Sequence, residues 1–191
     1  MQKLTHDILA ARQVENRCPP LPFFVVLNDI RSLYNVGSIF RTADGAGVGK
    51  LWICGITGFP PASRISKTAL GAENTVPWEY ERDPCVVIRR LKAEGTQIVL
   101  LEQMDRSVGY ETFEPQAPVC LVLGNEVSGV TDELASLCDA AVDIEMAGVK
   151  NSLNVTVAFG IAAYHFRKVL KKKGFGAALP EPRGGQMHAA V

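Results

Sequence analysis

The chain has 191 residues, of which 47% are hydrophobic, so its length suits one sizeable core and is short for two. Its 20 Lys and Arg residues balance 20 Asp and Glu residues, so it lacks the overall positive charge that often accompanies nucleic-acid binding. It has no export signal at the amino terminus and no apolar stretch near the roughly 20 residues of a membrane span, so we expect a cytoplasmic protein without membrane contacts.

The sequence predicts one globular domain over residues 23–173, preceded by a partly helical leader (1–22) and followed by a flexible, Gly-, Pro- and Ala-rich tail (174–191). The run FFVVLND, residues 23–29, is bounded by prolines and predicts a buried parallel strand. Apolar residues at positions 36, 39, 40, 43 and 47 then follow at helical spacing, with Asn35 placed to cap the first turn.

Further apolar runs recur at KLWICG, QIVLL, VCLVLG and AAVDIEM, and helical stretches such as PCVVIRRLKAEG lie between them. Thr131 opens one of these helices, and the last helix is expected over residues 152–173. Strands that alternate with helices predict an α/β fold with a mainly parallel sheet and helices on both faces.

Five scattered cysteines form no C-x-x-C pair, and three of them lie in or beside apolar runs. A thiol in such a run usually behaves as a small buried hydrophobe. We therefore expect neither a disulfide nor a metal site.

Three polar clusters follow predicted strands or open helices, at the edge where open α/β sheets bind ligands. The first, NDIRSLYNVGSIFRTADGAGV, would present Asn35, Ser38 and Arg41 on the polar side of one helix. The alternative is a capping Asn35 and a surface pair of Arg41 with Asp44, which spacing alone favours.

The second cluster, VCLVLGNEVSGV, runs from a strand directly into Gly124 and Glu126, where glycines allow a ligand to approach the backbone closely. An ordinary strand-to-helix turn would look similar. The third, IEMAGVKNSLNVTVA, places Ser152 and Asn154 at the start of the last helix, as an N-cap and a first-turn residue or as part of an anion site.

Together the three clusters resemble the three signature motifs of the SpoU/TrmH family of RNA 2′-O-methyltransferases, within the SPOUT superfamily, in order and spacing. The first matches N-x-R-x-x-x-N-x-G-x-x-x-R-T-A, with its leading Asn and Arg at Asn28 and Arg31 and one additional residue before the rest. The second matches G-x-E-x-x-G, and the third matches I-P-M-x-G-x-x-x-S-L-N-V except that Glu145 replaces the proline.

The resemblance implies a SPOUT methyltransferase domain with a deep carboxy-terminal trefoil knot, working as a homodimer on tRNA or rRNA. It implies S-adenosyl-L-methionine as cofactor, held by Leu123, Gly124, Ile144, Met146 and Leu153. It assigns catalysis to Arg41, aided by Asn35, Glu126, Ser152 and Asn154. No metal is required, because the sulfonium of the cofactor is itself reactive.

Because the net charge is zero, RNA binding must use local basic residues, and we expect Arg31, Arg64 and Lys67 to contribute. A guanidinium has a pKa above about 12, so Arg41 is better suited to stabilise an alkoxide or hold a phosphate than to act as a base. The alternatives are a SPOUT-type RNA base methyltransferase and a non-catalytic RNA-binding module.

Overall fold

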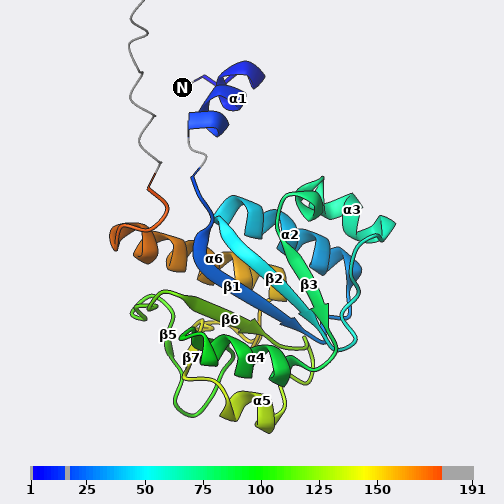
Figure 1. Ribbon diagram of the computed structural model, residues 1–191, viewed down its shortest axis with the longest axis vertical. Helices are drawn as coiled ribbons and strands as arrows, with labels where there is room; N and C mark the ends of the chain where they lie inside the picture. Colours follow the sequence, from blue (N-terminus) through cyan, green and yellow to red (C-terminus); the bar gives the residue numbers. More distant parts are fainter. Residues whose placement is uncertain (1, 16–17, 178–191) are drawn as a thin grey trace, which may run out of the picture.

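The computed structural model describes residues 2–15 and 18–177, and it contains a seven-stranded parallel sheet with the strand order β3-β2-β1-β6-β4-β7-β5 (Figure 1). The strands are β1 (Leu21–Asn28), β2 (Val48–Cys54), β3 (Trp78–Glu81), β4 (Gln97–Leu101), β5 (Val108–Gly109), β6 (Val119–Leu123) and β7 (Ala140–Asp143). The predicted α/β fold with a parallel sheet is confirmed.

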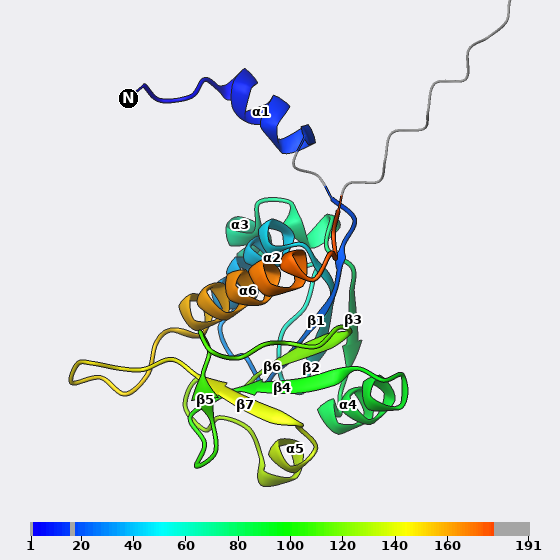
Figure 2. The ribbon, with the colours of Figure 1, turned by 90° about the vertical axis from the view of Figure 1, so that its left-hand side faces the viewer.

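Helices cover both faces of the sheet, with α2, α3 and α6 on one side and α4 and α5 on the other (Figure 2). The helices are α1 (His6–Glu15), α2 (Leu33–Ala46), α3 (Ser63–Ala69), the 3-10 turn η1 (Ala72–Asn74), α4 (Pro84–Ala93), α5 (Asp132–Ser136) and α6 (Val155–Lys172). None of the helices within the described ranges is long and apolar enough to cross a membrane.

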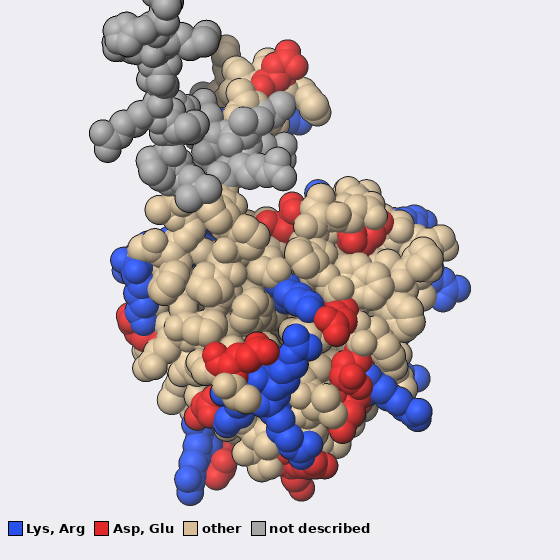
Figure 3. Space-filling model, in the orientation of Figure 1, with Lys and Arg blue, Asp and Glu red and all other residues tan. Residues whose placement is uncertain are grey.

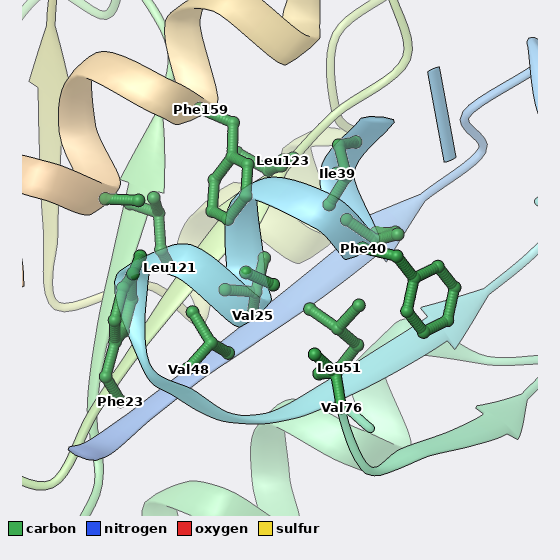
Figure 4. Packing of buried hydrophobic residues seen from close by; sticks show 14 of the residues in the cluster. Phe23, Val25, Ile39, Phe40, Val48, Leu51, Val76, Leu121, Leu123 and Phe159 are labelled. Atoms are coloured by element: carbon green, nitrogen blue, oxygen red, sulfur yellow. The ribbon is translucent and has the colours of Figure 1, made fainter. Parts of the chain in front are cut away.

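The larger part of the core lies between the sheet and α2 and α6, where side chains of β1, β2 and β6 meet Ile39, Phe40 and Phe159 (Figure 4). A second cluster lies on the opposite face, between the sheet and α4 and α5. The central strands β1 and β6 are buried on both faces, which is why they appear in the sequence as unbroken apolar runs.

Two predicted helix starts are wrong, because each cap lies at another residue. Ser32, not Asn35, caps α2, since its side chain accepts the N–H of Asn35 at 3.3 Å. Asn154, not Ser152, caps α6 by accepting the N–H of Thr156 at 2.9 Å. Both shifts move a predicted site residue relative to its helix. Thr131 caps α5 as predicted.

Gly37 lies where α3 crosses α2 and allows the two helices to approach closely. A Cβ atom at this position would lie 2.1 Å from Thr68 Oγ1 and 2.3 Å from the carbonyl oxygen of Ile65. The hydroxyl of Thr68 also donates to the carbonyl of Tyr34 at 2.9 Å. The first glycine of the first sequence cluster therefore has a packing role, and it fixes α3 beside the first turns of α2.

Candidate functional site

A cleft of about 720 Å³ opens at the carboxyl edge of the sheet, between the segments that follow β4, β6 and β7 and the start of α6. Its walls include all five residues assigned to the cofactor, together with two of those assigned to catalysis, namely Leu123, Gly124, Ile144, Met146, Leu153, Glu126 and Ser152. The carboxyl ends of β6 and β7 lie at the same edge of the sheet, which brings the second and third sequence clusters together.

The turn after β6 is held in a tight loop by Asn125 and Gly129, whose backbone groups exchange two hydrogen bonds of 3.0 Å. The Asn125 side chain accepts the N–H groups of Val127 and Ser128 and donates to the carbonyl of Asp29 at 2.8 Å. A Cβ atom at Gly124 would lie 2.8 Å from the Gly129 carbonyl carbon. The turn therefore requires glycine at position 124 and is tied to the end of β1.

The rim of the cleft offers unused backbone donors. Within the described part of the chain, the N–H groups of Gly124, Ile144, Met146 and Leu153 make no hydrogen bond to another backbone group or to a side chain. Such groups can bind the polar edge of a ligand, while the side chains of Leu123 and Leu153 supply apolar contacts.

A polar cluster beside the cleft joins three elements. The Asn35 amide on α2 donates to Glu126 Oε1 at 3.0 Å, and the backbone N–H of Arg31 donates to Glu126 Oε2 at 3.4 Å. Asn154, at the start of α6, donates to Asn35 Oδ1 at 3.5 Å. The structure therefore brings Asn35, Glu126 and Asn154 together, although 91 and 119 residues separate Asn35 from the other two.

Arg41 lies outside this cluster. It is exposed on α2 and, among the residues that the structure describes, its guanidinium has no hydrogen bond or ion pair. Arg41 lies six residues after Asn35, which corresponds to a rotation of about 120° around the helix axis. The two side chains therefore leave α2 in different directions. The alternative pair with Asp44 is also missing, because Asp44 Oδ1 accepts the Thr75 hydroxyl at 2.9 Å instead.

The three residues expected to contact RNA differ in ion pairing from the cations on the opposite face of the sheet. Arg31, Arg64 and Lys67 are exposed, and each lacks an ion pair to any described residue. On the face covered by α4, the cations lie among acidic residues (Figure 3) and are paired as Lys50–Glu79, Arg89–Glu133, Arg90–Glu94 and Lys92–Asp139. Uncompensated positive charge is therefore available on the α2 and α3 side.

Three further residues of the cleft were missed from the sequence, namely Glu102, Gln103 and Met104. They directly follow β4, and the Gln103 side chain donates to the carbonyl of Asn151 at 2.7 Å, across the mouth of the cleft. The sequence contained a signal for these three residues, because QIVLL was predicted as a strand and the residues after it belong at the carboxyl edge of the sheet.

Within the described ranges, no group of three or more His, Cys, Asp or Glu side chains is placed to hold a metal ion. The cysteines are free thiols. Burial raises the pKa of the Cys54 thiol to about 12 and that of Cys138 to about 11, with nearby carboxylates adding to both shifts. Burial also raises the pKa of Cys120. These thiols are protonated at neutral pH and are poor nucleophiles.

The sequence matches the SpoU rRNA Methylase family over residues 22–164. It is 29% identical over 185 residues to the tRNA (guanosine(18)-2′-O)-methyltransferase of Escherichia coli K12, covering 92% of this chain and 74% of the relative. It is 31% identical over 144 residues to a 23S rRNA (guanosine-2′-O-)-methyltransferase of Shewanella oneidensis, covering 75% of this chain and 58% of that one.

Solved structures share the fold. The Aquifex aeolicus TrmH/SpoU tRNA modifying enzyme superposes with a TM-score of 0.77 at 28% identity, covering 91% of each chain. An AdoMet-bound rRNA methyltransferase from Sinorhizobium meliloti gives 0.72 at 31% identity, covering 80% of this chain and 61% of that one. The chain belongs to the SpoU methylase family, and the family predicted from the three motifs is confirmed.

Proposed function

We propose that this protein transfers a methyl group from S-adenosyl-L-methionine to a ribose 2′-hydroxyl of tRNA or rRNA. One observation carries the proposal: in a chain of the SpoU family, the Asn35–Glu126–Asn154 cluster lies beside a cleft that is lined by free backbone donors. Relatives named as tRNA and rRNA 2′-O-methyltransferases, and a neighbour that contains AdoMet, support the same activity.

The cleft fits the cofactor in size and in chemistry. A volume of about 720 Å³ lies within the range of small-molecule sites, roughly 300–1,000 Å³. Backbone N–H groups of Gly124, Ile144, Met146 and Leu153 would hold the polar edges of the nucleoside, and Leu123 would contact its apolar faces. When bound, S-adenosyl-L-methionine supplies an electrophilic methyl group on a sulfonium.

The polar cluster would orient the ribose. Glu126 uses both carboxylate oxygens to hold the Asn35 amide and the Arg31 backbone, so its role is to position Asn35. The remaining N–H of the Asn35 amide and the free amide N–H of Asn154 can donate to ribose oxygens. Orientation matters here because the hydroxyl is a poor nucleophile that must attack in line with the departing sulfur.

Arg41 and Ser152 complete the proposed site. The Arg41 guanidinium carries only hydrogen-bond donors, so it can stabilise the forming alkoxide or hold an RNA phosphate that accepts the proton. No residue that the structure describes pairs with this guanidinium, so its donors are available to RNA. Ser152 lines the cleft beside Leu153 and would contact the same ligand.

We also propose the trefoil knot and the homodimer of this family. Two contacts between distant segments support the knot: Gln103 after β4 bonds Asn151 before α6, and Phe113 stacks on Phe166 of α6 with ring centroids 5.9 Å apart. The methyltransferase domain would comprise residues 23–173, with residues 1–22 as a leader. The predicted flexible tail extends beyond residue 177, outside the described residues.

The activity can be tested with purified protein, S-adenosyl-L-methionine carrying a labelled methyl group and unmodified tRNA and rRNA transcripts. Nucleosides from the digested RNA, separated by mass spectrometry, should contain a 2′-O-methyl ribose, and calorimetry should show cofactor binding in the presence of a chelator. A methylated base would favour a base methyltransferase. Absence of both cofactor binding and transfer would leave an RNA-binding module and refute the proposal.

A further inference from the structure

Three aromatic side chains form a cluster at the outer edge of the sheet, apart from the cleft. The Phe59 ring, on the loop after β2, lies 4.7 Å from the Tyr80 ring and 6.0 Å from the Trp78 ring, measured between centroids. Tyr80 and Trp78 alternate with Glu79 along β3, so both face the same side of the sheet as α2 and α3. We call Phe59, Trp78 and Tyr80 the aromatic platform.

The platform is more exposed than core packing requires. Phe59 is 44% exposed and Tyr80 is 38% exposed, whereas Trp78 rests partly buried against the core. The Tyr80 hydroxyl donates to the carbonyl of Gly55 at 2.9 Å, which fixes its ring against the loop. Two held and accessible aromatic rings are therefore presented to a ligand, and β3 is the outermost strand on this side of the sheet (Figure 1).

The loop that carries Phe59 is attached through Asp29 to the turn that carries Glu126, and it contacts the first turn of α2, which carries Asn35. The Asp29 carboxylate at the end of β1 accepts the backbone N–H of Ile56 at 2.9 Å, and the Asp29 carbonyl accepts the amide of Asn125 at 2.8 Å. Leu33, in the first turn of α2, packs against Gly58. The platform therefore lies one loop away from the residues proposed to orient the ribose, at the same carboxyl edge of the sheet.

Three exposed cations lie on the segments that adjoin the platform. Arg64 and Lys67 project from α3, which begins directly after this loop, and Arg82 follows Tyr80 by two residues. All three are exposed and have no ion pair within the described chain. Glu79 faces the other side of β3 and is paired with Lys50 at 2.7 Å, so it does not neutralise them.

We propose that the aromatic platform stacks unpaired bases of the RNA that flank the target nucleotide, while Arg64, Lys67 and Arg82 hold the phosphates. Exposed aromatic rings among unpaired cations are the combination by which proteins bind single-stranded RNA. This inference rests on the proposed function for the identity of the RNA, and it adds a site outside the cleft that selects unpaired segments over helical ones.

The test replaces the rings by leucine, which keeps apolar bulk and removes the planar faces. The double variant Phe59→Leu, Tyr80→Leu should weaken binding of a short oligouridylate by about fivefold or more, because it removes the stacking of at least one base. Cofactor affinity measured by calorimetry should not change. The control is Phe175→Leu, because Phe175 is also 38% exposed and its neighbour Gly176 lies against Leu21, at the amino end of β1 and away from the carboxyl edge.

A fluorescence measurement reports the place of binding. The chain has two tryptophans, and the buried Trp52 indole N–H has no hydrogen-bond partner among the described residues. Trp52→Phe therefore removes no hydrogen bond seen there and leaves Trp78 as the only indole. Oligouridylate should quench Trp78 emission in this variant, and the additional leucine substitutions should abolish the quenching. The variant Phe59→Trp retains a planar ring and should bind oligouridylate at least as tightly as the parent. It provides the comparison if the double variant does not fold.

The outcomes separate this inference from the proposed function. If the double variant binds oligouridylate like the parent while the parent methylates RNA, the platform is refuted and the function stands. If the parent neither binds S-adenosyl-L-methionine nor transfers a methyl group, the function is refuted. The oligouridylate measurement contains no cofactor, so it decides whether the platform binds unpaired bases even if the proposed function is wrong.

Discussion

Substitution of Gly37 by alanine offers a test of the packing argument for the first motif. The new methyl group would lie 2.1 Å from Thr68 Oγ1 and 2.3 Å from the Ile65 carbonyl oxygen, far inside van der Waals contact. Thr68 can rotate, but the carbonyl belongs to the backbone of α3. The variant must therefore push α3 away from α2.

Two opposing terms set the expected magnitude. Alanine in a helix interior is favoured over glycine by about 1 kcal/mol. Overpacking of a buried contact costs typically 1–3 kcal/mol, and a clash with backbone belongs at the upper end of that range. Gly37→Ala should therefore lower the free energy of unfolding by about 1–2 kcal/mol. Displacement of α3 should weaken RNA binding and spare the cofactor, because the residues that line the cleft come from neither α2 nor α3.

Gly160 provides a matched control, because it also lies inside a helix, and its new methyl group would meet only Thr42 Cγ2, at 4.0 Å. Gly160→Ala should stabilise the protein by about 0.5–1 kcal/mol. Urea unfolding of both variants at one protein concentration, with unchanged m-values, measures the difference. If Gly37→Ala is as stable as Gly160→Ala, the motif glycine is not there for helix packing and our reasoning is wrong.

Three further predictions concern the site and the thiols. Arg41→Ala should change the free energy of unfolding by less than about 0.5 kcal/mol, since the side chain is exposed and pairs with no described residue. It should nevertheless reduce methyl transfer at least about a hundredfold, and near-normal transfer would remove Arg41 from the mechanism. Glu126→Ala releases the Asn35 amide and should lower kcat with little loss of stability, and Asn35→Ala combined with it should lower kcat little further if Glu126 acts through Asn35. Stability should fall above about pH 9, because the Cys54 thiol loses its proton near pH 9.0 in the unfolded chain and keeps it to about pH 12 in the folded chain. Urea unfolding should show a loss of up to about 1.4 kcal/mol in the free energy of unfolding per pH unit for such a thiol. A flat pH profile would contradict the burial of Cys54.

The strands that form the site were predictable because parallel strands buried on both faces must be apolar along their whole length. FFVVLN, QIVLL and VCLVL all became central strands, and the polar residues after them lie at the carboxyl edge. The strand β3 was not predicted, because WEYE is a four-residue edge strand with half-exposed side chains and no apolar run. The platform that β3 carries was hidden for the same reason.

Helix ends were less predictable than helices. Ser32 and Asn35 are both good capping residues, and so are Ser152 and Asn154, so composition alone did not decide between them. The structure selects the residue that directly precedes the helix and whose side chain accepts an N–H of the first turn. In α2 this choice frees the Asn35 side chain for Glu126.

The sequence by itself determined the fold class, the family and which three segments carry polar residues at strand ends, because apolar runs and motif spacing are local properties. The strand order, which places β6 between β1 and β4, was decided only by the tertiary structure. That order brings Glu126 beside Asn35, since the two lie on elements 91 residues apart whose meeting depends on long-range packing. Tertiary packing also gives Phe59 its two aromatic neighbours, because the direction of its side chain depends on where the loop after β2 lies against the sheet.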